Sequence, residues 1–183
     1  MNLFVTDSCP TLSARALDDR RLVKAVLETA QLLSTVLGGP YRPTHAGHPV
    51  TKWVAAGAGN AGWTFRHFLA LCAEYTGRFG RTHACEAHAP AFGERLRREA
   101  GREAGPGDGA PAAFQNSAGN AALGFDFTDR PVPLSYRDYL LAKWRLDAAN
   151  GRPPKWTGRT PPGWAGAASF SSEASSGEAG KTP

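Results

Sequence analysis

The chain has 183 residues, of which 21 are Lys or Arg and 16 are Asp or Glu, so its formal net charge is +5 and its sequence pI is about 9.4. This length suits one domain with its own core rather than two, and the positive charge favours anionic partners. Three cysteines exclude a complete disulfide framework, which predicts a cytoplasmic protein. No apolar run approaches the roughly 20 residues that span a bilayer, so no membrane partner is expected.

The first strong helical pattern covers residues 11–37. Thr11 or Ser13 can cap its start, because either hydroxyl accepts a bond from a free backbone N–H. The Gly-Gly-Pro sequence at 38–40 ends it. A short apolar stretch at 3–5 precedes the helix and is expected to be extended.

The two faces of this helix differ sharply. One face repeats apolar side chains at helical spacing, namely Leu22, Val26, Ala30, Leu33 and Leu37. The other face is polar and carries Arg21, Lys24, Glu28, Gln31 and Thr35. Glu28 is the one acid of the polar face and follows cations, which suits a surface that faces phosphates around a single carboxylate. The competing interpretation is a plain ion pair between Lys24 and Glu28 on a solvated helix face.

A second helical region follows a loop over residues 41–49, with a break or close-packing point at 57–59. After Asn60 one face is apolar and consists of Phe65, Phe68, Leu69, Cys72, Tyr75 and Phe79. Four polar residues are expected to face elsewhere, namely His67, Glu74, Arg78 and Arg81. Gly80 occupies the position where a helix cap is expected.

The rest of the chain is less regular. Residues 92–103 fit a short charged helix, and Ser135 opens a last helix with Asp138 as a capping-box partner. We therefore predict an all-α, single compact domain of three principal helices with long loops over residues 1–164. The low-complexity stretch 165–183 is expected to be a disordered tail.

Cationic and aromatic residues alternate between positions 152 and 164, where Arg152, Lys155 and Arg159 are interleaved with Trp156 and Trp164. This composition fits a nucleic-acid contact, because cations bind phosphates and aromatic rings stack on bases. It also fits a strap whose tryptophans cover the core.

Four stretches of this sequence, at 19–33, 48–51, 72–80 and 145–156, resemble in order and spacing the pyrimidine-dimer DNA glycosylase/AP-lyase family, typified by endonuclease V of the T-even phages. The resemblance implies a compact all-α enzyme of DNA repair that binds double-stranded DNA as a monomer without a cofactor. In that family the N-terminal α-amine attacks C1′ of a damaged pyrimidine nucleotide. The imine that forms then permits strand cleavage.

The resemblance also implies site residues. The essential glutamate of the family matches Glu28, and the nucleophilic amine would belong to Met1 or, after methionine removal, to Asn2. An α-amine titrates about 2.5 pH units below lysine, so a useful fraction is neutral and nucleophilic near pH 7. The expected DNA contacts are Arg20, Arg21, Lys24, Gln31, His48, Arg78, Arg152, Lys155 and Trp156.

Two other functions remain open from the sequence. Leu27 and Gln31 stand where the family has arginines, which motivates a non-catalytic nucleic-acid-binding protein on the same scaffold. A zinc-stabilised structural domain is the second alternative, with five candidate ligands in loops, namely His45, His48, His83, Cys85 and His88.

Overall fold

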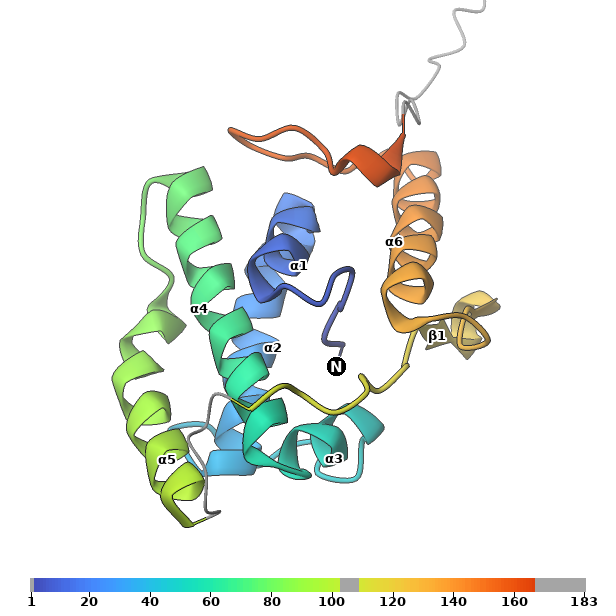
Figure 1. Ribbon diagram of the computed structural model, residues 1–183. Coiled ribbons are helices and arrows are strands. Elements are labelled where there is room, and N and C mark those ends of the chain that lie inside the picture. Colours follow the sequence, from blue (N-terminus) through green and yellow to red (C-terminus); the bar gives the residue numbers. More distant parts are fainter. Residues whose placement is uncertain (1, 103–108, 167–183) are drawn as a thin grey trace, which may run out of the picture.

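The computed structural model describes residues 2–102 and 109–166, and helices dominate this part of the chain (Figure 1). The α-helices are α1 (Pro10–Ala16), α2 (Asp19–Leu37), α3 (Pro49–Ala55), α4 (Ala58–Phe79), α5 (Ala89–Arg102) and α6 (Val132–Ala149). Three short 3₁₀ turns are η1 (Ala84–His88), η2 (Ala121–Leu123) and η3 (Gly163–Ala165). The predicted all-α fold is confirmed, with α2, α4 and α6 as the three longest helices.

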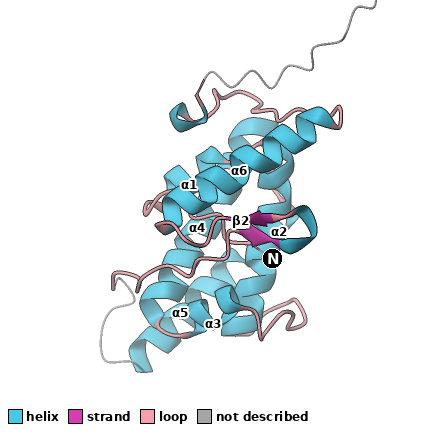
Figure 2. Cartoon of the chain, turned by 90° about the vertical axis from the view of Figure 1, so that its right-hand side faces the viewer, coloured by secondary structure: helices cyan, strands magenta, loops and turns pink. Residues whose placement is uncertain are grey.

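The small sheet is a minor exception to the helical fold. Strands β1 (Gly119–Asn120) and β2 (Phe125–Asp126) pair antiparallel, with Gly119 opposite Asp126 (Figure 2). No helix among the described residues combines the length and apolar character needed to cross a membrane. Of the predicted tail, residues 167–183 lie outside the described part.

The prediction of one helix over residues 11–37 is wrong, because Leu17 and Asp18 are extended and separate α1 from α2. The Leu17 side chain is fully buried. The Asp18 carboxylate accepts hydrogen bonds from Arg21 at 2.8 Å and from the Trp144 indole at 2.7 Å. These tertiary contacts hold the backbone extended at a point where the spacing of apolar residues in the sequence predicts a continuous helix.

The capping prediction at the start of this region is wrong as well. Cys9 occupies the N-cap position of α1, and Pro10 begins the helix, where its missing N–H costs nothing. Ser13 does not cap the helix. Its hydroxyl donates to the Asp7 carbonyl at 2.8 Å and accepts from the Asp7 N–H at 3.0 Å. At the other end, Gly38 follows α2 with φ of 72°, as the sequence predicts.

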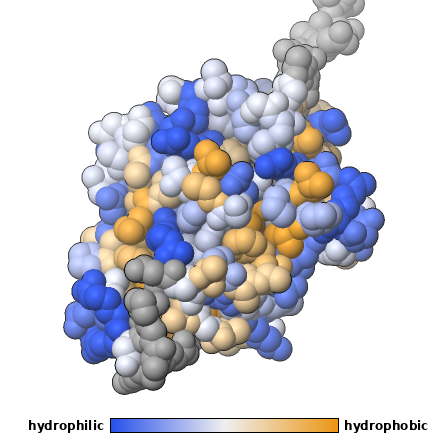
Figure 3. All heavy atoms as spheres, viewed as in Figure 1, coloured by the Kyte–Doolittle hydropathy of each residue, from blue (hydrophilic) through white to orange (hydrophobic). Residues whose placement is uncertain are grey.

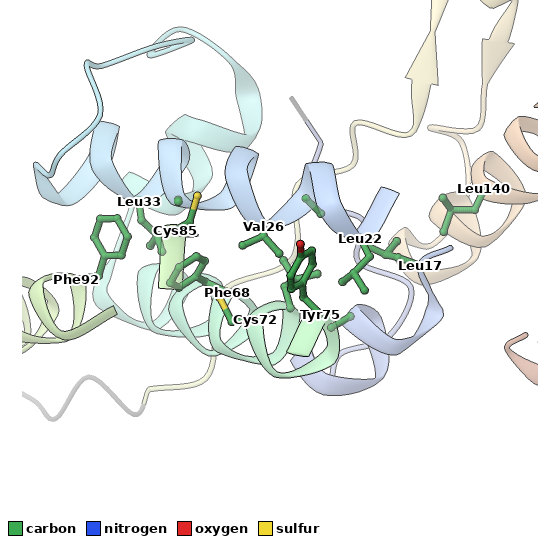
Figure 4. Close-up of a cluster of buried hydrophobic side chains, with 14 of the residues drawn as sticks. Leu17, Leu22, Val26, Leu33, Phe68, Cys72, Tyr75, Cys85, Phe92 and Leu140 are labelled. Carbon is green, nitrogen blue, oxygen red and sulfur yellow. The ribbon is translucent and has the colours of Figure 1, made fainter. Parts of the chain in front are cut away.

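The core lies between α2 and α4, and α5 and α6 extend it (Figure 4). Leu22, Val26 and Leu33 from α2 are fully buried, which confirms the predicted apolar face. From α4, Phe68 packs edge-on against Phe92 of α5, with ring centroids 5.7 Å apart. Burial of this apolar area is the main stabilising term.

Of the polar residues expected to face away from the apolar side of α4, His67, Glu74 and Arg78 are all buried. α1 packs along this side of α4. The His67 Nδ1 atom lies 3.0 Å from the Pro10 carbonyl oxygen, and its ring stacks on Trp63 at 5.1 Å. A helix with a single apolar stripe in its sequence is thus covered on two sides, because each polar group finds a partner from another segment.

Folding stability is expected to fall as the pH drops from 6.5 toward 4, because burial lowers the pKa of His67 to about 4. The unfolded chain binds a proton in this interval that the folded chain does not, so stability is complete above pH 6.5 and is lost below it. The loss is at most about 3 kcal/mol. Urea unfolding measured across this interval tests it. His67→Gln, which cannot titrate, should lose less stability than the wild type, and equal losses would contradict the assignment.

The start of α6 also differs from its prediction. The helix begins at Val132 rather than at Ser135, whose hydroxyl is buried and donates to the Arg130 carbonyl at 2.9 Å. Asp138 pairs with the Arg130 side chain instead of forming a capping box. After α6, residues 150–166 form the C-terminal strap, which crosses the molecule beside α1 (Figure 1).

The C-terminal strap contacts four helices, α1, α2, α4 and α6. The Trp156 indole donates to the Ala16 carbonyl at 3.2 Å, and its ring packs edge-on against Trp144 at 5.0 Å. The Thr157 hydroxyl donates to Asp19 at 2.7 Å, and Arg159 donates to Glu74 of α4 at 2.7 Å. The tryptophans of this segment therefore cover the core.

The predicted close-packing point before Asn60 lies at Gly59. A Cβ atom there would come within 2.7 Å of the Ala110 carbonyl oxygen. Gly59→Ala is expected to lower the free energy of unfolding by about 1–3 kcal/mol, because backbone must move. Gly77 in the same helix has no atom within 4 Å of such a Cβ, so Gly77→Ala should stabilise by about 0.5–1 kcal/mol. Urea unfolding of both variants decides the point, and a loss of the same size in Gly77→Ala would contradict it.

Figure 3 shows hydrophobic residues among hydrophilic ones on the face seen in Figure 1. The large apolar side chains that are exposed among the described residues come from several elements, namely Leu12, Val23, Leu27, Leu69, Leu123 and Leu134. Single exposed apolar residues of this kind are ordinary in globular proteins. The polar cavity described next is therefore the better candidate for a functional site.

Candidate active site

A cavity of about 590 Å³ lies between α2, α6 and the first described residues of the chain. The wall from α2 carries Arg20, Lys24 and Glu28, which are spaced by four residues and so share one face of the helix. Figure 1 shows the start of the chain between α2 and α6. The cavity therefore joins the polar face of α2 to the first described residues of the chain.

Glu28 faces this cavity and remains accessible. Its side chain is 18% exposed, and one carboxylate oxygen lies 3.3 Å from Nζ of Lys24. The Lys24 side chain is 73% exposed, so this ion pair contributes little to stability and its ammonium group can turn to another anion. The two interpretations of the helix face are thus compatible, since the paired acid also lines the cavity.

The first described residues of the chain line the same cavity as Glu28 and are anchored to α6. Asn2 lines the cavity, and its Oδ1 atom accepts a hydrogen bond from the Tyr136 hydroxyl at 3.2 Å. Leu3 and Val5 are buried, with 3% and 2% of their surface exposed. These contacts hold the chain start against α6. Met1, the other predicted source of the amine, lies outside the described residues.

Arg21 ties the two helical walls together. Its guanidinium donates to Asp18 at 2.8 Å and to Asp147 of α6 at 2.6 Å. Burial opposes its charge, but the two carboxylates outweigh this cost and raise the pKa of Arg21. Arg20, which is half exposed, lies 3.5 Å from Asp147. Because Arg21 is paired twice and only 10% exposed, it is placed to position the walls rather than to bind phosphate.

The α6 wall repeats the spacing of the α2 wall, with Tyr139, Lys143 and Asp147 four residues apart. Lys143, and Arg152 from the C-terminal strap, form no ion pair with any carboxylate of residues 2–102 and 109–166. Both cations are therefore available to an anionic ligand. Sequence analysis missed Lys143 as a site residue, although its helical spacing from Tyr139 is a signal that could have found it.

A second hollow of about 360 Å³ adjoins the cavity. Arg20 and Arg152 line both spaces, and Lys155 lines the second one. Asp18 and Asp19 also line the second hollow, so cations continue along the beginning of the C-terminal strap beside two carboxylates. A polyanion is the kind of ligand that such a series of cations can bind.

His48 also lines the cavity and caps α3. Its Nδ1 atom accepts a hydrogen bond from the Val50 N–H at 3.2 Å. Burial, together with neighbouring positive charge, lowers the pKa of His48 below its usual value of 6.5. The imidazole is therefore mainly neutral at pH 7.

Four of the predicted DNA contacts lie outside the cavity lining, and of these Lys155 lines the second hollow. Arg78 is 2% exposed and donates to Glu74 at 2.8 Å and to Asp19 at 3.0 Å, so its burial contradicts a phosphate contact. Trp156 is half buried against the core and does not present a free ring. Gln31 is half buried on α2, beyond Glu28.

The donors predicted for zinc do not converge. Among the described residues, no group of three or more His, Cys, Asp or Glu side chains is placed to hold a metal ion. The His83 Nδ1 atom instead accepts from the Cys85 N–H at 3.2 Å, and Cys85 lies 3.1 Å from the Tyr41 hydroxyl. His45 lies 2.7 Å from the Thr44 hydroxyl. His45, His48, His83 and Cys85 thus each have a structural partner other than a metal ion.

Comparison with known proteins gives one match. Residues 1–87 match the family model described as pyrimidine dimer DNA glycosylase, whereas no curated protein and no solved structure matches the chain. The matched segment contains Glu28, Lys24 and His48 of the cavity, while the α6 wall lies beyond it. The resemblance inferred from the sequence is confirmed: over its first 87 residues, this chain resembles the pyrimidine dimer DNA glycosylases.

Proposed function

We propose that this protein is a DNA N-glycosylase with AP-lyase activity, which acts on a damaged or modified pyrimidine through its N-terminal amine and Glu28. The observation that carries the proposal is the shared cavity. Glu28 and Asn2 line the same space, and five cationic side chains from α2, α6 and the C-terminal strap surround them. A nucleophile, an acid and a phosphate-binding surface are the parts that such a reaction requires.

The proposed reaction begins at C1′ of the target nucleotide. The amine uses its lone pair to form a bond to C1′ while the C1′–N1 bond breaks. The electron pair of the broken bond leaves with the pyrimidine, which takes up a proton. Glu28 accepts a proton from the amine and stabilises the positive charge that develops at C1′. A second proton leaves the nitrogen and the C1′–O4′ bond opens, with the oxygen taking up a proton, which produces the imine.

Strand cleavage follows from the imine. Loss of a proton from C2′ expels the 3′ phosphate by β-elimination, and water then hydrolyses the imine and releases the protein. The target nucleotide, or its partner base, must leave the helical stack before C1′ can be reached. The cavity volume of about 590 Å³ accommodates one extruded nucleotide, and the cations around it can hold the neighbouring phosphates.

Covalent trapping tests this proposal. The protein is incubated with a duplex that carries one abasic site, and separately with an ultraviolet-irradiated duplex, in the presence of borohydride. We expect a covalent adduct, and peptide mapping should place it on the first residue of the mature chain rather than on Lys24 or Lys143. Intact-mass measurement decides whether that residue is Met1 or Asn2.

Two outcomes of these experiments would contradict parts of the proposed activity. Absence of an adduct, together with no base release from damaged or modified duplexes, would exclude a glycosylase. Salt-sensitive duplex binding without turnover would then favour a non-catalytic binding protein. An adduct on Lys24 or Lys143 would retain the enzyme but exclude the N-terminal amine as its nucleophile.

Lys143→Met is expected to weaken duplex binding regardless of sequence and to reduce the salt dependence of binding by about one phosphate contact. Lys143 lines the cavity without a carboxylate partner among the described residues, so its ammonium group is available to bind a phosphate. Lys52→Met is the matched control, because Lys52 is exposed on α3 and does not line this cavity. Binding titrations at several salt concentrations test the prediction, and identical slopes in the two variants would contradict it.

A further inference from the structure

Helix α6 contacts the start of the chain at three successive points. The Tyr136 hydroxyl donates a hydrogen bond to Oδ1 of Asn2 at 3.2 Å. The ring of Phe4 lies edge-on to the Tyr136 ring, with centroids 6.1 Å apart. Further along, Nε of Arg137 donates to the Thr6 carbonyl oxygen at 2.9 Å. The first described residues are therefore held by one helix that follows them by more than 120 positions in the sequence.

Asn2 is the outermost of these anchored residues. Leu3 and Val5 are held by packing, since both belong to a buried cluster that includes Leu32 of α2 and Val50 of α3. Asn2 is half-buried and lines the cavity instead. Among the described residues, its side chain has no hydrogen bond other than the one from Tyr136. This single bond is thus the last side-chain hydrogen bond before the N-terminal amine.

Tyr136 is well suited to hold the chain start. Its side chain is fully buried, so the ring has no room to turn away. Burial also raises the pKa of Tyr136 above its usual value of 10, which keeps the hydroxyl protonated and able to donate throughout the neutral range. The amine belongs either to Asn2 or to the residue before it, and consecutive Cα atoms lie only about 3.8 Å apart. A bond to the Asn2 side chain therefore restrains the amine in either case.

We propose that Tyr136 is a positioning residue, whose hydroxyl acts through Asn2 to hold the N-terminal amine toward Glu28 in their shared cavity. The inference deepens the proposed glycosylase function and rests on it. Chain ends are ordinarily poorly ordered unless they are tied down. Displacing a reacting group by about 1 Å can slow a reaction about 100-fold, so an amine fixed in advance is an advantage. Tyr136 lies beyond residues 1–87, so the family match does not assign this role.

Tyr136→Phe tests the role, because phenylalanine keeps the ring and removes only the hydroxyl. Single-turnover borohydride trapping is measured over a range of concentrations of a duplex with one abasic site. The maximal rate should fall about 10- to 100-fold. The half-saturating duplex concentration should stay at the wild-type value, because no contact to DNA is lost. A residue that only stabilised the fold would not produce this separation.

Asn2→Leu removes the other partner of the bond while keeping the size of the side chain. It should slow trapping by a similar factor, and the double variant should be no slower than the slower single variant, since both changes remove one shared interaction. Intact-mass measurement confirms that every variant begins with the same residue as the wild type. Tyr41→Phe is the matched control, because the Tyr41 hydroxyl lies 3.1 Å from the Cys85 thiol outside this cavity. It should trap at the wild-type rate.

The outcomes separate this inference from the function on which it rests. Failure of the wild type to form an adduct would overturn the glycosylase and the positioning role with it. With wild-type trapping intact, a wild-type rate in Tyr136→Phe would overturn only the positioning role. Losses that multiply in the double variant would also overturn it, because the hydroxyl would then act independently of Asn2. An equal loss in Tyr41→Phe would do the same.

Discussion

Glu28→Gln is expected to lower pyrimidine excision and borohydride trapping by at least about 100-fold, in line with the contribution of a general acid or base. The amide keeps the shape of the side chain but neither accepts the proton of the amine nor stabilises positive charge at C1′. Glu28 is 18% exposed and its ion pair with Lys24 is largely solvated, so the protein should remain folded. Single-turnover excision and adduct formation measure the effect.

Duplex binding distinguishes this catalytic role from a structural one. Removing a negative charge from a cationic cavity should leave DNA affinity equal to or higher than that of the wild type. Glu94→Gln is the matched control, because Glu94 forms the same kind of pair with Arg98 four residues later, outside this cavity. Full activity of Glu28→Gln, or an equal loss in Glu94→Gln, would contradict the assignment.

Glu74→Leu should lower the free energy of unfolding by about 3 kcal/mol. Glu74 is 5% exposed and accepts from Arg78, whose side chain is 2% exposed, as well as from Arg159 of the C-terminal strap. Without this carboxylate, the buried Arg78 cation loses a close counter-charge and the strap loses its bond to α4. Leucine fills the space of the glutamate side chain, so the loss of stability comes from the missing negative charge rather than from a cavity. The melting temperature should fall by about 10 °C for a domain of this size.

Two further variants test the cause of this loss. Glu94→Leu removes an exposed partner of Arg98 at the same helical spacing and should cost less than about 1 kcal/mol. Adding Arg78→Met to Glu74→Leu removes the uncompensated cation and should restore part of the stability. Thermal and urea unfolding provide both values. A double variant less stable than Glu74→Leu would contradict the explanation by an unpaired buried charge.

Much of the candidate site follows from local patterns. Helical spacing places Lys24 and Glu28 on one polar face of α2, because a side chain four residues on points the same way whatever the helix packs against. The glycine after that helix, Gly38, has the positive φ that its position predicts. The same spacing places Lys143 on one face of α6. It does not predict that this face lies opposite the polar face of α2, more than 100 residues away in sequence.

Two of the errors in the sequence predictions share one physical origin. Asp18 interrupts a continuous helical pattern because Trp144, 126 residues away, donates to its carboxylate. Arg78 was expected to contact DNA, but it is buried and donates to the Arg15 carbonyl of α1. Each outcome depends on contacts between segments that are distant in sequence. The helical repeat within one segment does not predict such contacts.

The amino-acid sequence by itself determined the helical class, the apolar face of α2 and the lone acid Glu28 on its polar face, because these depend on spacing within one helix. Tertiary structure alone decided that Asn2, Glu28 and Lys143 share one cavity. It also decided that Arg78 is buried and pairs with Asp19 of α2 and Glu74 of α4 instead of binding a ligand. The physical reason is that buried polar groups need hydrogen-bond or ion-pair partners, and these partners come from distant segments of the chain. Helical periodicity alone does not show which polar face of a helix is covered by such a segment and which stays exposed.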